Sequence, residues 1–191
     1  MLALKDGSSI PYVTSGSYAD IFIDQQAAKV YKIFISEPDG GLRQTPKSTL
    51  DAIRRENFTA QIDAYEIAGV DEFLAAHTPQ FFGLADVAAV QDRVGNDVSH
   101  QYLLPCCYVV QRLDGCDEKL DPQSDEAPEH VKTFAQRCRA VGINYVRDAS
   151  VFHRDTPDHF MVIDFATREI GDALVDAEIR LLARGLSAVA V

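Results

Sequence analysis

Three strand-like segments follow one another closely in the first part of the chain, and this arrangement constrains the fold more than any other feature. Residues 10–14 and 19–24 flank a Ser-Gly-Ser turn signal, so they predict a hairpin with Gly16 near its tip. Residues 27–35 are rich in β-branched and aromatic side chains, which favour a third strand. This part of the chain is therefore expected to be β-rich.

A long helix and then alternating strands and helices are expected after this β-rich part. Residues 36–48 contain several Gly and Pro residues and predict a loop, and a helical spacing of apolar residues then runs to Gly69. The remaining expected elements are a strand from Phe81, a longer strand at 102–113, an acidic loop at 114–128, a helix at 129–141, strand-like pieces at 151–152 and 160–163, and a last helix at 172–188. This order predicts an α+β fold.

Composition and charge exclude several classes of protein. With 191 residues, 47% hydrophobic and 25% charged, the chain is expected to form one globular domain, residues 1–191. No run of 18 apolar residues is present, so no membrane-spanning helix is expected, and the first residues do not resemble a standard secretory signal. The net charge of −11 argues against nucleic acid and anionic membranes as partners. The four cysteines lack zinc-site spacing and are expected to be reduced thiols.

The order of elements is the one that a protein kinase-like fold presents, namely five strands with one helix followed by a mostly helical lobe. Phosphoryl transfer needs a backbone cradle for the phosphates, a cation on them, metal-binding carboxylates and a base near the acceptor hydroxyl. Gly16 and Ser17, in the expected hairpin, are the candidates for the cradle. Taken alone, the same residues are also explained by an ordinary hairpin turn.

The candidate cation is Lys29, in the expected third strand. Strand alternation places Lys29 and Lys32 on opposite faces, so only one of them can point into a cleft. In the kinase arrangement this lysine is held by a glutamate on the next helix, and Glu56 is the candidate for that role. A solvated surface lysine and an exposed helical glutamate are the alternatives for these two residues.

Two aspartates in the second half of the chain are the candidates for catalysis. Asp164 ends an apolar strand and is the candidate magnesium ligand, and Asp148 follows a helix and is the candidate catalytic base. Asp155 belongs to a His-Arg-Asp tripeptide but lies too near Asp164 to leave room for a second metal ligand and a hairpin. With Asp148 as the base, the second metal ligand falls at His153, where kinases have Asn.

These motifs resemble the minimal effector kinases that some pathogenic bacteria inject into host cells (OspG-, NleH- and HopBF-type). The similarity runs from Gly16 to about Phe165 and is carried by the segments 16–22 and 162–165. It implies a two-lobed fold with a five-stranded N-lobe sheet, about 1–112, and a truncated helical C-lobe, about 113–191. The chain departs from the family at Val146, where the loop histidine is usual, and at His153.

The resemblance implies an ATP- and Mg²⁺-dependent protein kinase, acting on Ser/Thr more than Tyr. The implied catalytic residues are Asp148 and Lys29, the implied metal ligands are Asp164 and His153, and the implied nucleotide contacts are Gly16, Ser17, Lys29, Glu56, Gln111 and Leu113. The expected partner is a protein substrate, such as a host protein, and the chain is expected to be a monomer. The expected location is the host cell cytoplasm, reached through a type III secretion system, or the bacterial cytoplasm.

Two other functions remain open from the sequence. A pseudokinase-like binding module would use the fold as a scaffold for a host partner, and Val146 and His153 favour it. A small-molecule phosphotransferase would share the fold, and an acidic surface would attract a cationic substrate. The short C-terminal part leaves little room for the substrate pocket of such enzymes, so this interpretation ranks third.

Overall fold

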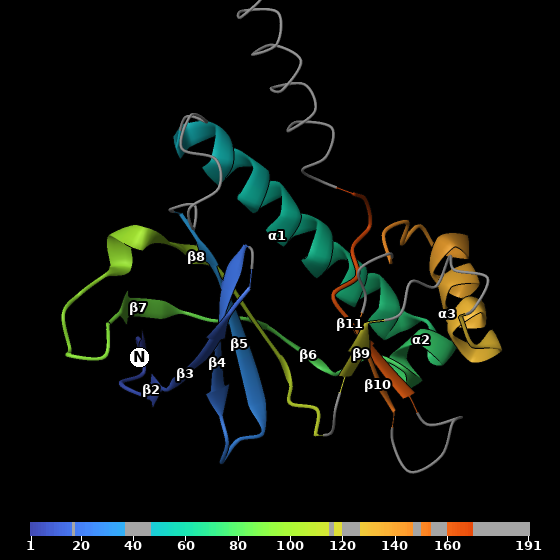
Figure 1. The fold of residues 1–191 in the computed structure, drawn as a ribbon, viewed down its shortest axis with the longest axis horizontal. Helices are drawn as coiled ribbons and strands as arrows, with labels where there is room; N and C mark the ends of the chain where they lie inside the picture. Colours follow the sequence, from blue (N-terminus) through green and yellow to red (C-terminus); the bar gives the residue numbers. More distant parts are fainter. Residues whose placement is uncertain are drawn as a thin grey trace, which may run out of the picture.

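The fold mixes a central antiparallel sheet with a few helices, and it is seen in a computed structural model (Figure 1). The structure describes residues 1–16, 18–36, 47–114, 117–119, 127–146, 150–153 and 160–169, with backbone only for 117–119 and 153. The expected α+β class is confirmed at this level. The expected helix at 172–188 lies outside the described residues.

Five antiparallel strands form the central sheet in the order β3-β4-β5-β8-β6. Their bounds are β3 (Tyr12–Ser15), β4 (Ala19–Asp24), β5 (Lys29–Ile35), β8 (Tyr102–Gln111) and β6 (Phe81–Leu84). The expected hairpin at Gly16 and the expected third strand are both present. The adjacent cysteines, Cys106 and Cys107, are buried free thiols in β8, as a buried strand requires.

A second, smaller sheet covers one face of the central sheet, which we call the outer face. It has the order β2-β1-β7 and consists of β1 (Leu2–Leu4), β2 (Ser9–Ile10) and β7 (Val87–Val90). The core between the two sheets contains Phe22, Ile33 and Val109 from the central sheet and Leu2 and Val90 from the small one. The sequence analysis did not predict this sheet, because its strands are short and pair over long distances in the chain.

The opposite, inner face of the central sheet packs against helix α1 (Lys47–Val70). The remaining elements lie beside one end of α1, namely α2 (Glu72–Ala76), α3 (Glu129–Ala140), β9 (Asp117–Lys119), β10 (Ser150–His153) and β11 (Phe160–Ile163), and a short 3-10 helix, η1 (Ser99–Gln101), precedes β8 (Figure 1). The three last strands form their own antiparallel sheet, in the order β11-β10-β9 (Figure 1). Phe34 and Tyr108 of the central sheet share a core with Tyr65 of α1 and Phe134 of α3.

Local signals fix where the helices begin and end. Helix α3 stops before Gly142, as expected, because this residue has a φ of +92°, a conformation that L side chains rarely adopt. Asp71 caps α2 by accepting a hydrogen bond from the backbone N–H of Leu74, and it also pairs with Arg137 of α3. The acidic segment expected to be a loop contains the strand β9 in its described part. In the described part of the chain, no helix is long and apolar enough to cross a membrane.

Candidate functional site

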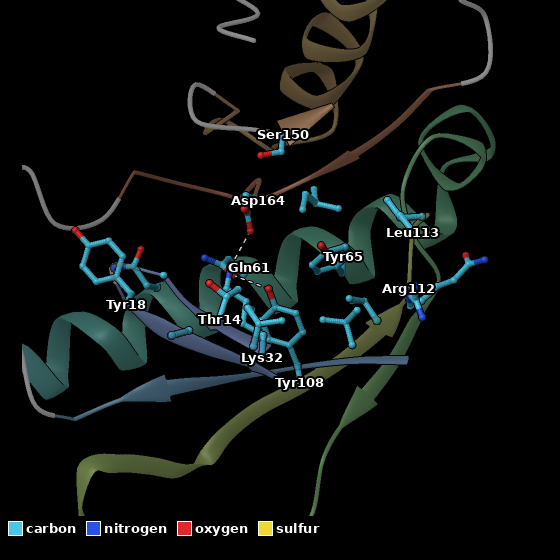
Figure 2. A pocket seen from close by; sticks show the side chains of 18 of the residues that line it. Thr14, Tyr18, Lys32, Gln61, Tyr65, Tyr108, Arg112, Leu113, Ser150 and Asp164 are labelled. Carbon is cyan, nitrogen blue, oxygen red and sulfur yellow. Dashed lines mark hydrogen bonds and ion pairs between the residues drawn. The ribbon is translucent and has the colours of Figure 1, made fainter. Parts of the chain in front are cut away.

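A cleft of about 1120 Å³ lies between the inner face of the central sheet and the β10–β11 hairpin. Its volume is slightly above the usual range for small-molecule sites, about 300–1,000 Å³. Figure 2 shows its side chains converging from several elements. The residues that line the cleft include Gly16 and Tyr18 at the β3–β4 turn, Lys32 on β5, Asn57, Gln61 and Tyr65 on α1, and Tyr108, Val110, Gln111 and Leu113 on and after β8. Ser150 on β10 and Asp164 after β11 line the opposite wall.

An ion pair crosses the cleft and joins its two walls. The Nζ atom of Lys32 donates to Oδ1 of Asp164 at 2.8 Å, and the two side chains are 17% and 39% exposed. Because the pair is only partly open to water, its attraction is screened less than that of a surface ion pair. A cation and a carboxylate therefore meet in one place, although they are far apart in the sequence.

The structure corrects the choice of lysine made from the sequence. Lys32 lines the cleft, whereas Lys29 lies on the outer face, where its Nζ is 4.8 Å from the ring centroid of Phe82. Strand alternation correctly predicted that the two lysines point to opposite faces. Alternation does not show which face of the sheet the helix covers. The choice of Lys29 as the lysine in the cleft was therefore wrong.

Helix α1 presents amides, not a carboxylate, to the cleft. Asn57, Gln61 and Tyr65 follow one another at intervals of four residues, so they lie on one face of the helix, and all three line the cleft. Glu56 is exposed and does not line the cleft. The expectation that Glu56 holds the lysine is therefore corrected, because the helix turns the residue one position later inward.

A hydrogen bond between two neutral side chains ties α1 to the sheet behind Lys32. The hydroxyl of Tyr108 donates to Oε1 of Gln61 at 2.8 Å (Figure 2). Burial raises the pKa of Tyr108 well above its usual value, and the negative charge of Asp164 raises it further. The Tyr108 hydroxyl therefore keeps its proton. The Nζ atom of Lys32 lies 6.0 Å from the centre of the Tyr108 ring.

The backbone at Asp164 has an uncommon conformation that the surrounding core maintains. Its φ is +61°, in the left-handed region. The next residue, Phe165, is fully buried, and its ring lies 4.7 Å from Tyr65 and 6.3 Å from Phe134, centre to centre. The anchored Phe165 ring therefore helps to hold the Asp164 carboxylate at the cleft.

The neighbouring strand brings a serine to the cleft that the sequence analysis missed. Ser150 is almost fully buried, lines the cleft and pairs in register with Ile163, the residue before Asp164. His153 pairs with Phe160 at the other end of the hairpin, three residues or roughly 10 Å of strand away. The register therefore places the His153 backbone away from Asp164, and the role of its side chain as a metal ligand stays a prediction.

Two candidate bases lie outside the described residues, as does Ser17. Asp148 falls between Val146 and Ser150, and Asp155 falls between His153 and Phe160. Val146 and Ser150 are buried close to the Asp164 end of the hairpin, whereas His153 and Phe160 pair at the opposite end. The choice of Asp148 over Asp155 as the catalytic base stays a prediction.

The β3–β4 turn and the end of β8 both line the cleft. The backbone N–H of Gly16 donates to the Ala19 carbonyl at 2.7 Å, and a Cβ atom on Gly16 would lie 3.3 Å from the same oxygen. A side chain would crowd this turn, which explains the glycine. Gln111 and Leu113 both line the cleft where the chain leaves β8.

The described residues offer few ligands for a metal ion. No group of three His, Cys, Asp or Glu side chains that could hold a metal is found in the part of the chain that the structure describes. The Asp164 carboxylate and the Ser150 hydroxyl lie at the cleft on adjacent strands, and both provide oxygen. Such a set fits Mg²⁺, which usually takes one or two carboxylates and completes its shell with phosphates and water.

Comparisons with models of known protein families, with curated proteins and with solved structures gave no match to this chain.

Proposed function

We propose that the chain is an ATP-dependent phosphotransferase with a two-lobed protein kinase-like fold, and that it transfers phosphate to a protein. The Lys32–Asp164 ion pair across the cleft is the observation that carries this proposal. Phosphoryl transfer requires a cation on the phosphates and a carboxylate for the metal, placed against each other. The strand order, the helix on the inner face and the hairpin that ends at Asp164 support the same interpretation.

The main residues of the cleft have distinct roles in this proposal. Lys32 leaves Asp164 and contacts the phosphates of the nucleotide, and the turn at Gly16 lies over the phosphates. Asp164 and Ser150 are the side chains that would hold Mg²⁺. The bound metal would neutralise charge on the phosphates during transfer. Val110, Gln111 and Leu113 form the end of the cleft that receives the adenine.

The base and the acceptor complete the proposal. Asp148 accepts the proton of the acceptor hydroxyl, and it is preferred to Asp155 because its described neighbours lie beside the Asp164 end of the hairpin. The acceptor is a protein side chain, with Ser or Thr preferred to Tyr. The similarity to bacterial effector kinases makes a host protein the proposed substrate.

The test uses transfer of labelled γ-phosphate from ATP to a generic protein acceptor and to the chain itself. Asp164→Asn removes the metal-binding charge with little change of shape, and Lys32→Met removes the cation. Both variants should lose transfer, while Lys29→Met, on the opposite face of the same strand, should retain it. Transfer by purified Asp164→Asn at the wild-type rate would contradict the proposal.

A scaffold function is the second candidate, and one feature of the site favours it. Helix α1 offers neutral amides where an active kinase has a glutamate, and Glu56 is exposed. A binding module would need the fold but no phosphoryl transfer. A thermal-shift measurement with ATP, with and without Mg²⁺, separates the two functions. A metal-dependent shift supports the enzyme, and no shift with either supports the scaffold.

A further inference from the structure

We infer that Gln61 binds the phosphate groups of the nucleotide directly through its side-chain amide nitrogen, and that Tyr108 is the positioning residue that orients this amide. The inference rests on the proposed function, since it names a further contact in the same cleft. It differs from the role first expected of a residue on this helix, which was to hold the lysine.

The first step is the placement of Gln61. It lies on the cleft-facing side of α1 between Asn57 and Tyr65, and its side chain lines the cleft near Lys32 and Asp164 (Figure 2). Within the described residues, the hydrogen bond of its side chain is the one that its Oε1 accepts from the Tyr108 hydroxyl, at 2.8 Å. This bond uses the amide oxygen and leaves the amide nitrogen, which carries two N–H donors.

The second step is the direction of that hydrogen bond. Tyr108 is 2% exposed, so its side chain is held in place by the core. Its hydroxyl donates to the Oε1 atom of Gln61 at 2.8 Å, so the hydrogen bond occupies the amide oxygen. The amide nitrogen is on the other branch of the group, so it does not meet Tyr108 and is available to a ligand in the cleft that Gln61 lines.

The third step is the chemistry of what this donor can meet. The Lys32 ammonium lies in the same part of the cleft, 2.8 Å from the Asp164 carboxylate and 6.0 Å from the Tyr108 ring centre. An ammonium and an amide N–H₂ are both donors, so together they suit an acceptor with several oxygens and negative charge. A polyphosphate chain is such an acceptor, and hydrogen bonds to charged groups are the stronger ones.

The substitution that follows from this geometry is Gln61→Glu. A carboxylate has nearly the same shape and can still accept from Tyr108, but it has no N–H to donate and would repel phosphate. If the residue instead served to hold Lys32, the same change would strengthen that contact. The two roles therefore predict opposite effects on ATP affinity.

The experiment measures binding of ATP with Mg²⁺, adenosine and inorganic tripolyphosphate to the full chain by titration calorimetry. Gln61→Glu should weaken ATP and tripolyphosphate roughly tenfold or more and leave adenosine unchanged. Gln61→Met, which has no donor and no charge, should weaken both phosphate ligands less. Tyr108→Phe, which frees the amide, should weaken them a few-fold. Gln26→Glu, in the exposed turn between β4 and β5, makes the same charge change away from the cleft and should have no effect.

The outcomes separate this inference from the proposed function. Wild-type affinity for ATP in Gln61→Glu, or tighter binding, overturns the role of Gln61 and leaves the phosphotransferase proposal in place. If the wild type binds tripolyphosphate through Gln61 but no ATP, the phosphate contact stands and the nucleotide proposal fails. If the wild type binds neither ligand, both are overturned. Melting temperatures of all variants near the wild-type value show that each affinity refers to folded protein.

Discussion

The two faces of the central sheet differ in what they pack against and in what they leave open. The outer face is closed by the β2-β1-β7 sheet over an apolar core that includes Phe22 and Ile33. The inner face is only partly filled, by the aromatic contacts among Tyr65, Tyr108 and Phe165, and the rest is the cleft that contains the Lys32–Asp164 ion pair. Successive side chains of a strand point to opposite faces, so one residue of a strand can pack in the outer core while the next residue lines the cleft.

The two lysines of β5 give the most direct test of this difference between the faces, because Lys32 lies on the inner face and Lys29 on the outer face. Replacing Lys32 with Met should reduce phosphate transfer ~100-fold or more, because a cation placed on the reacting phosphates stabilises the transition state. Replacing Lys29 with Met should change transfer little, since its ammonium lies over Phe82 on the outer face. Rates of labelled phosphate transfer measure both. Equal losses of transfer rate in the two variants would show that the reaction does not depend specifically on the inner face.

The outer core is tested by a change that should affect stability and not binding. Phe22 is 1% exposed and packs edge-on against Tyr12. Phe22→Ala should lower the free energy of unfolding by about 3–5 kcal/mol, as for other buried aromatic residues. Urea unfolding measures the loss, and ATP affinity under folding conditions should remain that of the wild type. A large loss of affinity in fully folded protein would mean that the small sheet shapes the cleft.

A smaller, pH-dependent effect is expected at the contact between α2 and α3. The hydrogen bonds from Arg137 and from the Leu74 backbone lower the pKa of Asp71 below its ordinary value of 3.8. A carboxyl group with a lowered pKa stabilises the fold above that ordinary value, and this stabilisation is lost as the pH falls through the lower, folded-state pKa.

Asp71→Asn retains a capping side chain for α2 but loses the ion pair with Arg137. It should therefore lower the melting temperature by a few degrees at pH 7. The difference from wild type should shrink as the pH falls below about 4. A difference that stays constant from pH 7 to pH 3 would assign the effect to the cap alone.

The smallest effect is expected at the exposed edge of the central sheet. Leu84, on the edge strand β6, is 60% exposed. Leu84→Ser should change the free energy of unfolding by no more than about 0.5 kcal/mol, because exposed positions without special contacts are tolerant. Urea unfolding next to Phe22→Ala gives the contrast. A loss comparable to that of Phe22→Ala would show that this edge is covered in solution.

The sequence was most informative where a pattern is local. The alternation in 19–24, the long helix that follows and the glycine after α3 all appear as expected, since turn and capping signals act within a few residues. Gln111 ends the long apolar strand β8 and Leu113 follows it closely, and both line the cleft. The α+β class follows from these elements together.

The rest depends on contacts between distant segments. Whether Lys29 or Lys32 enters the cleft is decided by the side of the sheet on which α1 packs, and a strand's own sequence does not contain that information. The small sheet pairs Leu2 with Val90, and Ser150 reaches the cleft through its pairing with Ile163. The roles of Asp148, Asp155 and Ser17 remain predictions.

The left-handed backbone of Asp164 limits which residues this position can accept. Asn and Asp adopt a φ near +60° more readily than other side chains, whereas β-branched residues do so at a considerable cost. A screen of all substitutions at this position, read out by folding alone, should therefore tolerate Asn and Gly and reject Val and Ile. A second screen of the same variants for phosphate transfer would measure the need for a negative charge at residue 164. The variants that fold but do not transfer phosphate would show which property of aspartate each process requires.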